Sequence, residues 1–395
     1  MASRRTVLVI STVLGCTTEG PADPVTTTTG LTVTPDGDTT AATEGTTSSA
    51  SATSVGADAS SSGTGSTSNG FGGIFDVGTV ADMGTGPKVE LTCDNIDDVT
   101  ATSVGCEFYA VDLSMLASNE LAFGISVGNP GSVAANVVIE DMRGAGGSLR
   151  EVTSLVVGPD ESVLVSINGQ GGVLAGQDHQ VIPGANPLAA FHVRSDVPIT
   201  AMQINPVGGG PSHVAEASLL LPVNALDTSH FAVGYQALIP GGGFVAVVAS
   251  EDGTTLDTTA GSTMLDAFDV QVYATTDPTG FFVGADAPVA VFSGTTCTNI
   301  PGAQGACDHL EEVSFPVEYW GSRYLVAPLT TYDAEHVDFP NVVRITAQRD
   351  GTVVTLDPPI EAQRTLAAGE SMEVRVPLPV AISGPSAMPM PWAVV

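Results

Sequence analysis

The sequence is poor in basic residues. Lys and Arg together number 11 against 43 Asp and Glu, and Lys88 is the only lysine. The resulting formal net charge of -32 repels the phosphates of nucleic acids, so we expect no nucleic-acid partner. Long apolar runs are missing too. No stretch reaches the about 18 apolar residues that a membrane-spanning helix needs, which excludes such a helix.

Charged residues are also scarce, at 14% of the chain, whereas there are 45 glycines and 26 prolines. This composition disfavours long helices, which require Ala, Leu, Glu and Lys, and favours short strands joined by tight turns. From about Val89 onward, apolar and polar residues alternate with a period of two, as in strands with one buried face. The sequence therefore predicts an all-β fold.

The N-terminus has the organisation of an export signal. A short basic segment precedes an apolar stretch, Thr6–Leu14, that is too short to cross a bilayer. The sequence "VLGC", which ends at Cys16, resembles the bacterial lipobox. The resemblance implies a lipoprotein signal peptide over 1–15, lipidation of Cys16, and attachment of a bacterial protein to the outer membrane or cell surface through this lipid anchor only. An ordinary signal peptide with a chance cysteine is the alternative.

Residues 16–88 are rich in Ser, Thr and Gly and contain almost no large apolar side chains. Such a segment cannot bury enough apolar surface to form a core, so we predict a disordered tether. The tether would hold residues 89–395, the predicted β region, away from the membrane.

Sequence elements recur within the β region. "VRSDVPITAMQ" (193–203) and "VGADAPVAVFS" (283–293) share Val-x-x-Asp-x-Pro before an alternating strand, and "LPVNALD" resembles "FPVEYWG". The recurrences predict tandem Ig-like antiparallel β-sandwich units. A β-propeller-like assembly is the alternative, because each unit is long enough for two blades. The three predicted units are about 91–205, 216–295 and 313–383.

Two Asp-Gly dipeptides predict hairpins at matching places in the second and third units. In "NVVRITAQRDGTVVTLDPP", a turn at Asp350-Gly351 would pair Ala347 with Val354. "FVAVVASEDGTTLDTT" repeats this arrangement around residues 252–253. We therefore expect the two turns to occupy equivalent positions in one shared strand order.

The third unit departs from the pattern at its end. It has no Asp-x-Pro strand and finishes in "VAISGPSAMPMPWAVV". If all units share one strand order, the third should lack its closing strand or take "PWAVV" (391–395) for it.

Four cysteines remain when Cys16 is set aside. An even number in an exported protein implies disulfides, and the four fall into two pairs that are close in the sequence. We predict the bonds Cys93–Cys106 and Cys297–Cys307. A zinc site that uses Cys307 is the alternative, although the Cys-x2-Cys spacing is absent.

No pattern of residues in the chain predicts catalysis or a resident cofactor. The stretch "GISVG" around Ser126 matches the GxSxG motif, which requires a strand, a sharp turn and a helix. Here "NPG" and a second alternating strand follow, so we assign no catalytic residue.

One acidic cluster, in "TYDAEHVDFP", supplies the candidates for a calcium or transition-metal site. The EF-hand spacing and its glycine are missing, so a solvated acidic loop is the alternative and we assign no metal. The candidates are Asp333, Glu335, His336 and Asp338.

The most distinctive stretch is "AVFSGTTCTNIPGAQGACDHLEEVSFPVEYWGSRYLVAPL" (290–329). Its strand into Ser293-Gly294, its Cys-x9-Cys-Asp-His-Leu segment (297–310) and the Pro-Val-x-x-Trp that follows resemble the N-terminal domain of the IgGFc-binding protein family. That domain is found in a mucin-associated vertebrate protein and in bacterial surface proteins, including those of myxobacteria. The resemblance covers most of 91–383 and implies a binding protein without catalytic residues.

We expect a lipid-anchored cell-surface binding or adhesion protein that presents its β units on a flexible stalk to an extracellular protein or glycan. A structural envelope component without a soluble ligand is the alternative. Exposed aromatic side chains at Tyr319 and Trp320 would favour binding, whereas burial of both would mean core packing. A secreted hydrolase would require a cluster of titratable or metal-binding groups that the sequence does not show.

Overall fold

The computed structural model consists of strands and short 3-10 helices, and the part of the chain that it describes contains no α-helix. In the same part, no helix is long and apolar enough to cross a membrane. All strand pairs are antiparallel, which confirms the predicted all-β class. The predicted signal peptide, Cys16 and the tether lie outside the described residues. The described ranges are 91–99, 102–116, 122–209, 214–300, 307–327, 341–377, 379–384 and 392–394.

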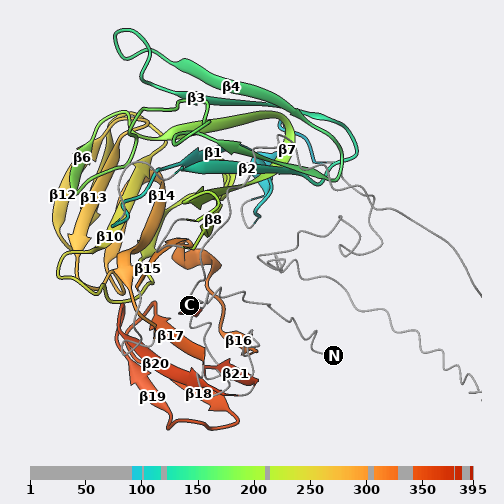
Figure 1. The fold of residues 1–395 in the computed structure, drawn as a ribbon. Helices are drawn as coiled ribbons and strands as arrows, with labels where there is room; N and C mark the ends of the chain where they lie inside the picture. The colour runs from blue at the N-terminus through green and yellow to red at the C-terminus, as the bar shows by residue number, and fades with distance from the viewer. Residues whose placement is uncertain are drawn as a thin grey trace, which may run out of the picture. The chain divides into compact units, whose positions relative to one another are not determined.

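Six strands of the first unit and β8, at the start of the second, form one seven-stranded sheet (Figure 1). They are β1 (Gly105–Ala110), β2 (Gly124–Asn129), β3 (Ala135–Asp141), β4 (Arg150–Val157), β5 (Glu161–Ser166), β7 (Phe191–Asn205) and β8 (Glu216–Leu220). The order is β4-β3-β7-β2-β5, and β1 and β8 also pair with β7. The long β7 serves both halves of the sheet, because its first part pairs with β3 and its second part with β2.

Eight strands form the second sheet. They are β6 (Gly184–Asn186), β9 (Asp227–Phe231), β10 (Gly243–Ala249), β11 (Thr254–Thr258), β12 (Gly261–Leu265), β13 (Val270–Thr275), β14 (Phe282–Thr298) and β15 (Asp308–Val313). The order is β12-β11-β14-β10-β13-β6, and β9 and β15 also pair with β14. By sequence β6 belongs to the first predicted unit, so this sheet crosses the boundary between the first two units.

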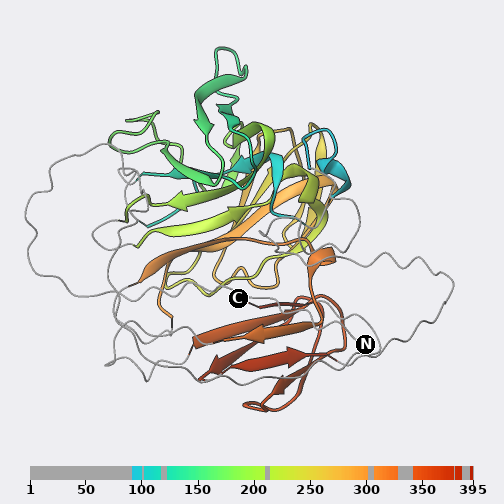
Figure 2. The same ribbon diagram turned by 90° about the vertical axis from the view of Figure 1, so that its right-hand side faces the viewer.

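The third unit has two smaller sheets, whose strands are coloured orange to red in Figures 1 and 2. The four-stranded sheet has the order β16 (Arg323–Val326), β21 (Val380–Ser383), β18 (Thr352–Asp357) and β19 (Arg364–Leu366). The three-stranded sheet has the order β20 (Ser371–Val376), β17 (Asn341–Ala347) and β22 (Trp392–Val394). The 3-10 helices are η2 (Ile96–Asp98), η3 (Val223–Ala225) and η4 (Val317–Tyr319).

One pattern of strand pairing occurs in all three units. In the first, β2 pairs with β5, β3 with β4, and β7 with both β2 and β3. In the second, β10, β13, β11, β12 and β14 repeat these pairings in the same order. In the third, β17 pairs with β20 and β18 with β19. The units therefore share the strand order that their sequence recurrences predicted.

The third unit replaces the long strand by two short ones. β21 pairs with β18, and β22 pairs with β17. The register also matches, since Ala249 lies opposite Val289 in the second unit and Ala347 lies opposite Trp392 in the third. The segment predicted to stand in for the missing strand, 391–395, thus contains β22.

The recurrent Asp-x-Pro motif lies where the long strand changes partners. The Asp196 carboxylate accepts a hydrogen bond from the backbone N–H of Asn136 at 2.8 Å, and Asp286 accepts one from Thr255 at 2.7 Å. The hydrogen bond from the Asn136 side chain, followed by the one from its backbone, lowers the pKa of Asp196, and the hydrogen bonds from Thr255 lower the pKa of Asp286. The motif therefore joins the two halves of the long strand to the start of β3 or β11.

The two predicted Asp-Gly hairpins are wrong as hairpins, although their positions are equivalent. β17 and β18 lie in different sheets, and β10 and β11 each pair with β14 but not with one another. Ala347 and Val354 are both buried, yet they contribute to one core from opposite sheets. A period of two and a turn dipeptide specify which side chains face inward, but they do not specify which strands pair.

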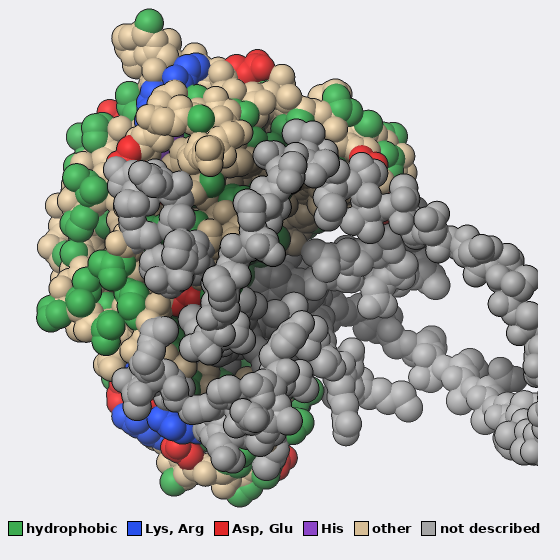
Figure 3. All heavy atoms as spheres, viewed as in Figure 1, with side chains coloured by type: hydrophobic (Ala, Val, Ile, Leu, Met, Phe, Trp, Pro, Cys, Tyr) green, Lys and Arg blue, Asp and Glu red, His purple; other side chains and the backbone are tan. Residues whose placement is uncertain are grey.

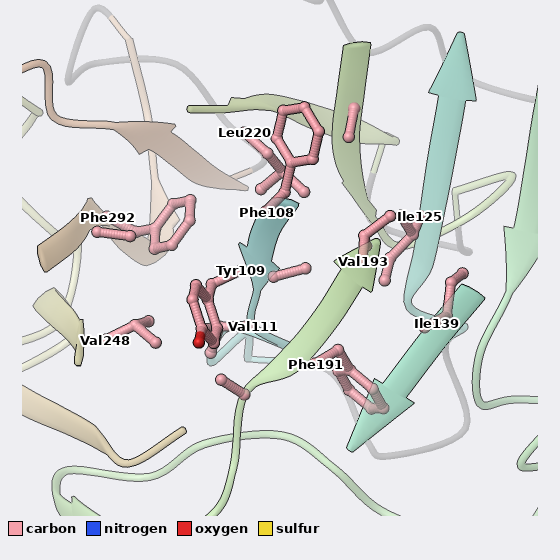
Figure 4. Close-up of a cluster of buried hydrophobic side chains, with 14 of the residues drawn as sticks. Phe108, Tyr109, Val111, Ile125, Ile139, Phe191, Val193, Leu220, Val248 and Phe292 are labelled. Carbon is pink, nitrogen blue, oxygen red and sulfur yellow. The ribbon is translucent and has the colours of Figure 1, made fainter. Parts of the chain in front are cut away.

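The first two units share a hydrophobic core, part of which Figure 4 shows. β10 is buried on both faces: Val245 and Val247 face the core of the second unit, whereas Ala246 and Val248 join the cluster that contains Phe108 of β1. β6 adds backbone pairing to β13 across the same boundary. These contacts make the first two units one packed structure.

The third unit has a core of its own, against which Val233 and Phe231 of the second unit also pack. Arg344 adds polar contacts between the same two units. Arg344 Nη1 donates to Asp277 Oδ2 at 2.8 Å, to Thr279 Oγ1 at 2.9 Å and to the carbonyl oxygen of Gly234 at 3.2 Å. Its guanidinium lies 4.2 Å from the ring centroid of Tyr235. The face of β17 opposite its own core is therefore a junction rather than free surface.

Candidate functional site

The segment Cys307 to Glu312, part of the most distinctive stretch of the sequence, covers most of β15. Cys297, at the end of β14, is disulfide-bonded to Cys307, with their Cα atoms 5.3 Å apart. The second predicted bond, Cys93–Cys106, is also present, with a Cα distance of 5.7 Å. Because a disulfide sulfur is neither a nucleophile nor a metal ligand, the zinc alternative at Cys307 is wrong.

A glycine allows β15 to approach β14 closely beyond the disulfide. Gly294 lies opposite Glu311 in the register. A Cβ atom at this position would collide with the carbonyl oxygen of Leu310 and would lie 2.8 Å from the ring of Phe244. The Ser-Gly pair of the sequence motif is therefore a packing requirement of this strand pair.

Three side chains from two sheets form a buried network: Gln203, His309 and Glu311. His309 Nε2 lies 3.0 Å from Glu311 Oε2, and neither side chain is exposed to solvent. Gln203 Nε2 donates to Glu311 Oε1 at 3.2 Å, and its own Oε1 accepts the backbone N–H of Val111 at 3.0 Å. The network thus joins β15 to β7 and to the segment after β1.

The residues beside this network add further links to the first sheet. Asp308 accepts the backbone N–H of Val214 at 3.0 Å. Ser218 of β8 donates to Glu312 Oε1 at 3.3 Å and accepts the backbone N–H of Val313 at 2.8 Å. Asp308 and Glu312 therefore contact β8 or the residues just before it, whereas His309 and Glu311 belong to the buried network.

A buried carboxyl group, Asp112, lies in the same region. Burial and, to a smaller extent, the nearby charge of Glu311 raise the pKa of Asp112 to about 8, although a hydrogen bond from Asn168 Nδ2 at 2.6 Å opposes the shift. Asn168 also accepts the backbone N–H of Phe123 at 2.5 Å. The region therefore contains a protonated carboxyl group near neutral pH.

Solvent does not reach His309 or Glu311, so neither can transfer a proton to or from an external substrate. Their hydrogen bonds instead satisfy polar groups between two packed sheets. We conclude that the motif stabilises the boundary of the first two units.

The motif lies in a part of the chain that is similar to known proteins. Residues 216–390 match the model of the IgGFc-binding protein family. The human IgGFc-binding protein is 27% identical over 248 residues, which is 56% of this chain and 4% of the human protein. The chain thus spans only a small part of that relative. No solved structure matches. The two matches support the family resemblance seen in the sequence.

The family match includes the features described above. They are the Cys297–Cys307 disulfide, the buried His309–Glu311 pair, and Tyr319 and Trp320 of the Pro-Val-x-x-Trp region. Trp320 is 8% exposed and donates its indole N–H to the carbonyl oxygen of Phe315 at 3.0 Å. Trp320 is thus a core residue, whereas Tyr319 in η4 is partly exposed.

The other sequence candidates do not form a site. Ser126 lies in the middle of β2, opposite Leu164 and Met202, so the GxSxG stretch is an ordinary strand and not a nucleophile turn. In the described ranges no group of three or more His, Cys, Asp or Glu could hold a metal ion. The metal candidates Asp333, Glu335, His336 and Asp338 lie outside those ranges, as does Cys16.

Sequence reasoning missed Asp112, Asn168 and Gln203. Gln203 carried a usable signal, because it occupies an inward position of an alternating strand between Ala201 and Asn205, both of which are buried. A polar residue at an inward position requires a partner. Asp112 and Asn168 lie outside regular strands and gave no such signal.

Proposed function

We propose that this chain is a bacterial cell-surface binding protein, anchored through lipid at Cys16, whose β region binds an extracellular protein or glycan. The match of residues 216–390 to the IgGFc-binding protein family carries the proposal of binding. The lipobox resemblance supports the anchor and the outer membrane or cell surface as the location. Two disulfides suit an oxidising environment outside the cytoplasm.

An uncovered apolar row on the first unit supports a binding surface. Leu164 of β5 and Met202 of β7 flank Ser126 and are 46% and 39% exposed. The shared strand order makes Val272 and Phe292 their equivalents in the second unit, where both are buried against the first unit. The first unit therefore presents to solvent a face that is covered in the second.

The test is binding of the purified full chain to an array of extracellular proteins, including IgG Fc, and of glycans. We expect a specific ligand whose binding is lost in the double variant Leu164→Ser with Met202→Ser. Leu325→Ser is the matched control, because Leu325 is 45% exposed on β16 of the third unit. A chain that binds nothing on the array, yet whose loss weakens the envelope, would favour the structural alternative.

The anchor has a separate test. Metabolic labelling with a fatty-acid analogue in a bacterial host should label the wild-type chain and leave Cys16→Ala unlabelled. Equal labelling of the two would contradict the lipoprotein assignment without affecting the proposed binding.

A further inference from the structure

The first unit contains an insertion that the other two lack. Residues 167–190 connect β5 to β7, whereas the equivalent connection in the second unit, between β13 and β14, is only 276–281. The insertion is attached at several points: Val181 donates its N–H to the carbonyl oxygen of Asp112 at 2.9 Å, and β6 pairs with β13. An ordered insertion in a single repeat is a place where a repeat protein acquires a separate function.

The insertion lines a cavity of about 210 Å³ together with Arg143 of the connection between β3 and β4. This volume suits a molecule of the size of an amino acid or a monosaccharide. The residues of the insertion that line it include Asp178, His179 and Ala189.

Two of the lining side chains have buried nitrogens without a hydrogen-bond partner among the described residues. His179 is only 5% exposed, and both of its ring nitrogens lack a partner. Arg143 donates from Nη2 to the carbonyl oxygen of Ala189 at 3.3 Å, but its buried Nη1 has no acceptor. A buried donor without an acceptor costs about 1–3 kcal/mol, so the Arg143 N–H and the imidazole N–H would each gain from an occupant that supplies acceptor oxygens.

The Phe191 ring contacts both side chains. The His179 ring meets the Phe191 ring edge to face, with centroids 5.3 Å apart, and the Arg143 guanidinium lies 5.7 Å from the same centroid. Phe191 itself is fully buried at the start of β7. Both donors lie in connections between strands, and their contacts with the Phe191 ring join them to the core of the first unit.

The chemistry of these donors favours a carboxylate. A guanidinium presents two parallel N–H groups that match the two oxygens of a carboxylate, and an imidazole N–H adds a third donor. Burial lowers the pKa of Arg143, and the carboxylates of Asp141, Asp112 and Asp178 oppose this shift. Asp178, exposed at the rim, opposes anions of higher charge such as phosphate dianions.

We propose that this pocket binds the carboxylate of a small monoanionic ligand, with Arg143 and His179 as the residues that contact it. The carboxylate can belong to an acidic sugar or to an amino-acid chain end, because both present the same group at the same size. This site goes beyond the proposed binding of a macromolecule and is separate from the apolar row of Leu164 and Met202.

The test is saturation-transfer NMR on the purified full chain with matched pairs of probes. Glucuronate is compared with glucose, and N-acetylglycine with N-acetylglycinamide. We expect saturable binding of at least one carboxylate below roughly 10 mM and none of its neutral partner, since the ion pair supplies most of the affinity. The pair that binds identifies the source of the carboxylate.

Variants link this binding to the pocket. Arg143→Met should weaken the carboxylate at least about tenfold, and His179→Phe should weaken it as well, because each removes a donor to the charged group. Arg364→Met, an exposed arginine of the third unit, should bind like the wild type. Near-ultraviolet circular dichroism shows whether each variant is folded, and Arg143→Leu or His179→Leu replaces the corresponding variant if it is not.

Three results would overturn the proposal: no carboxylate binds at that concentration, neutral and charged partners bind equally, or inorganic phosphate binds more tightly than every carboxylate. Retained macromolecular binding in Arg143→Met, together with lost carboxylate binding, would show that the two sites are distinct. Loss of array binding in the Leu164 and Met202 double variant, with carboxylate binding retained, would bear only on the proposed function and not on the pocket.

Discussion

Two buried titratable residues with opposite behaviour link the stability of this protein to pH. Asp112 is 3% exposed, and burial raises its pKa from the ordinary value of 3.8 to about 8. Between these two pH values, the folded state keeps a proton on Asp112 that the unfolded state has released. His230 is fully buried, and burial lowers its pKa below 6.5, so the folded state disfavours a proton that the unfolded state binds. Stability should therefore fall toward alkaline pH because of Asp112 and toward acidic pH because of His230.

The variant Asp112→Asn tests the alkaline side. In the wild type, the contribution of Asp112 is fully present below about pH 4 and decreases as pH rises toward about 8. The asparagine cannot ionise and can still accept the hydrogen bond from Asn168, so its urea midpoint should depend less on pH between 5 and 9. Asp257→Asn, at an exposed position of β11, is the control and should keep the wild-type slope. An unchanged slope in Asp112→Asn would contradict the assignment.

At the scale of elements, the long strand organises each of the first two units. β7 and β14 each pair with two strands that lie in different halves of the sheet, and the Asp-x-Pro motif marks the change of partner. In the third unit the same two pairings are made by β21 and β22, which are separate segments. A strand supplied by a separate segment is more easily released than the continuation of a bound strand. Its pairing closes a loop and costs conformational entropy, whereas the continuation of a bound strand is already held next to its partner.

Removal of residues 391–395 tests the role of β22. The deletion leaves β17 with β20 as its single partner, so the amides of β17 should exchange with solvent faster. The amides of β10, which keeps both β13 and β14, should be unaffected and serve as the internal control. Ala393→Pro, which disrupts the pairing of Ala393 with Thr346, should have the same effect as the deletion. Unchanged exchange in β17 would show that β22 adds nothing to the sheet.

At the scale of the whole molecule, equivalent positions make both junctions between units, but with different chemistry. The face of β10 that carries Ala246 packs into an apolar cluster with the first unit. Arg344 occupies the equivalent position of β17 and reaches the second unit through hydrogen bonds and a stacked tyrosine. An apolar interface cannot open without exposing its surface to water, whereas a polar one can exchange its hydrogen bonds for water. Because Val233 and Phe231 of the second unit also pack against the core of the third, the second junction combines apolar burial with the polar contacts of Arg344.

Arg344→Met tests the second junction. The side chain is 13% exposed, and the loss of its charged hydrogen bonds should destabilise the third unit by roughly 2 kcal/mol. Arg364→Met removes an exposed ion pair with Glu370 in the same unit and should cost less than about 1 kcal/mol. Denaturant unfolding followed by hydrogen exchange in β17 and β20 measures both variants. An equal effect of the two would mean that the junction does not stabilise the third unit.

The sequence alone determined the properties that depend on neighbouring residues. Alternation specified strands and their inward side chains, recurrent motifs revealed that the units are equivalent, and short spacing identified both disulfide partners. The tertiary structure decided which strands pair, and it assigned Ala347 and Val354 to opposite sheets of one core. It also brought Gln203 to Glu311 and Arg143 to His179, which are distant in the chain. Alternation is a local property, whereas pairing and buried polar contacts depend on which surfaces exclude water together, and that is settled only when the whole chain packs.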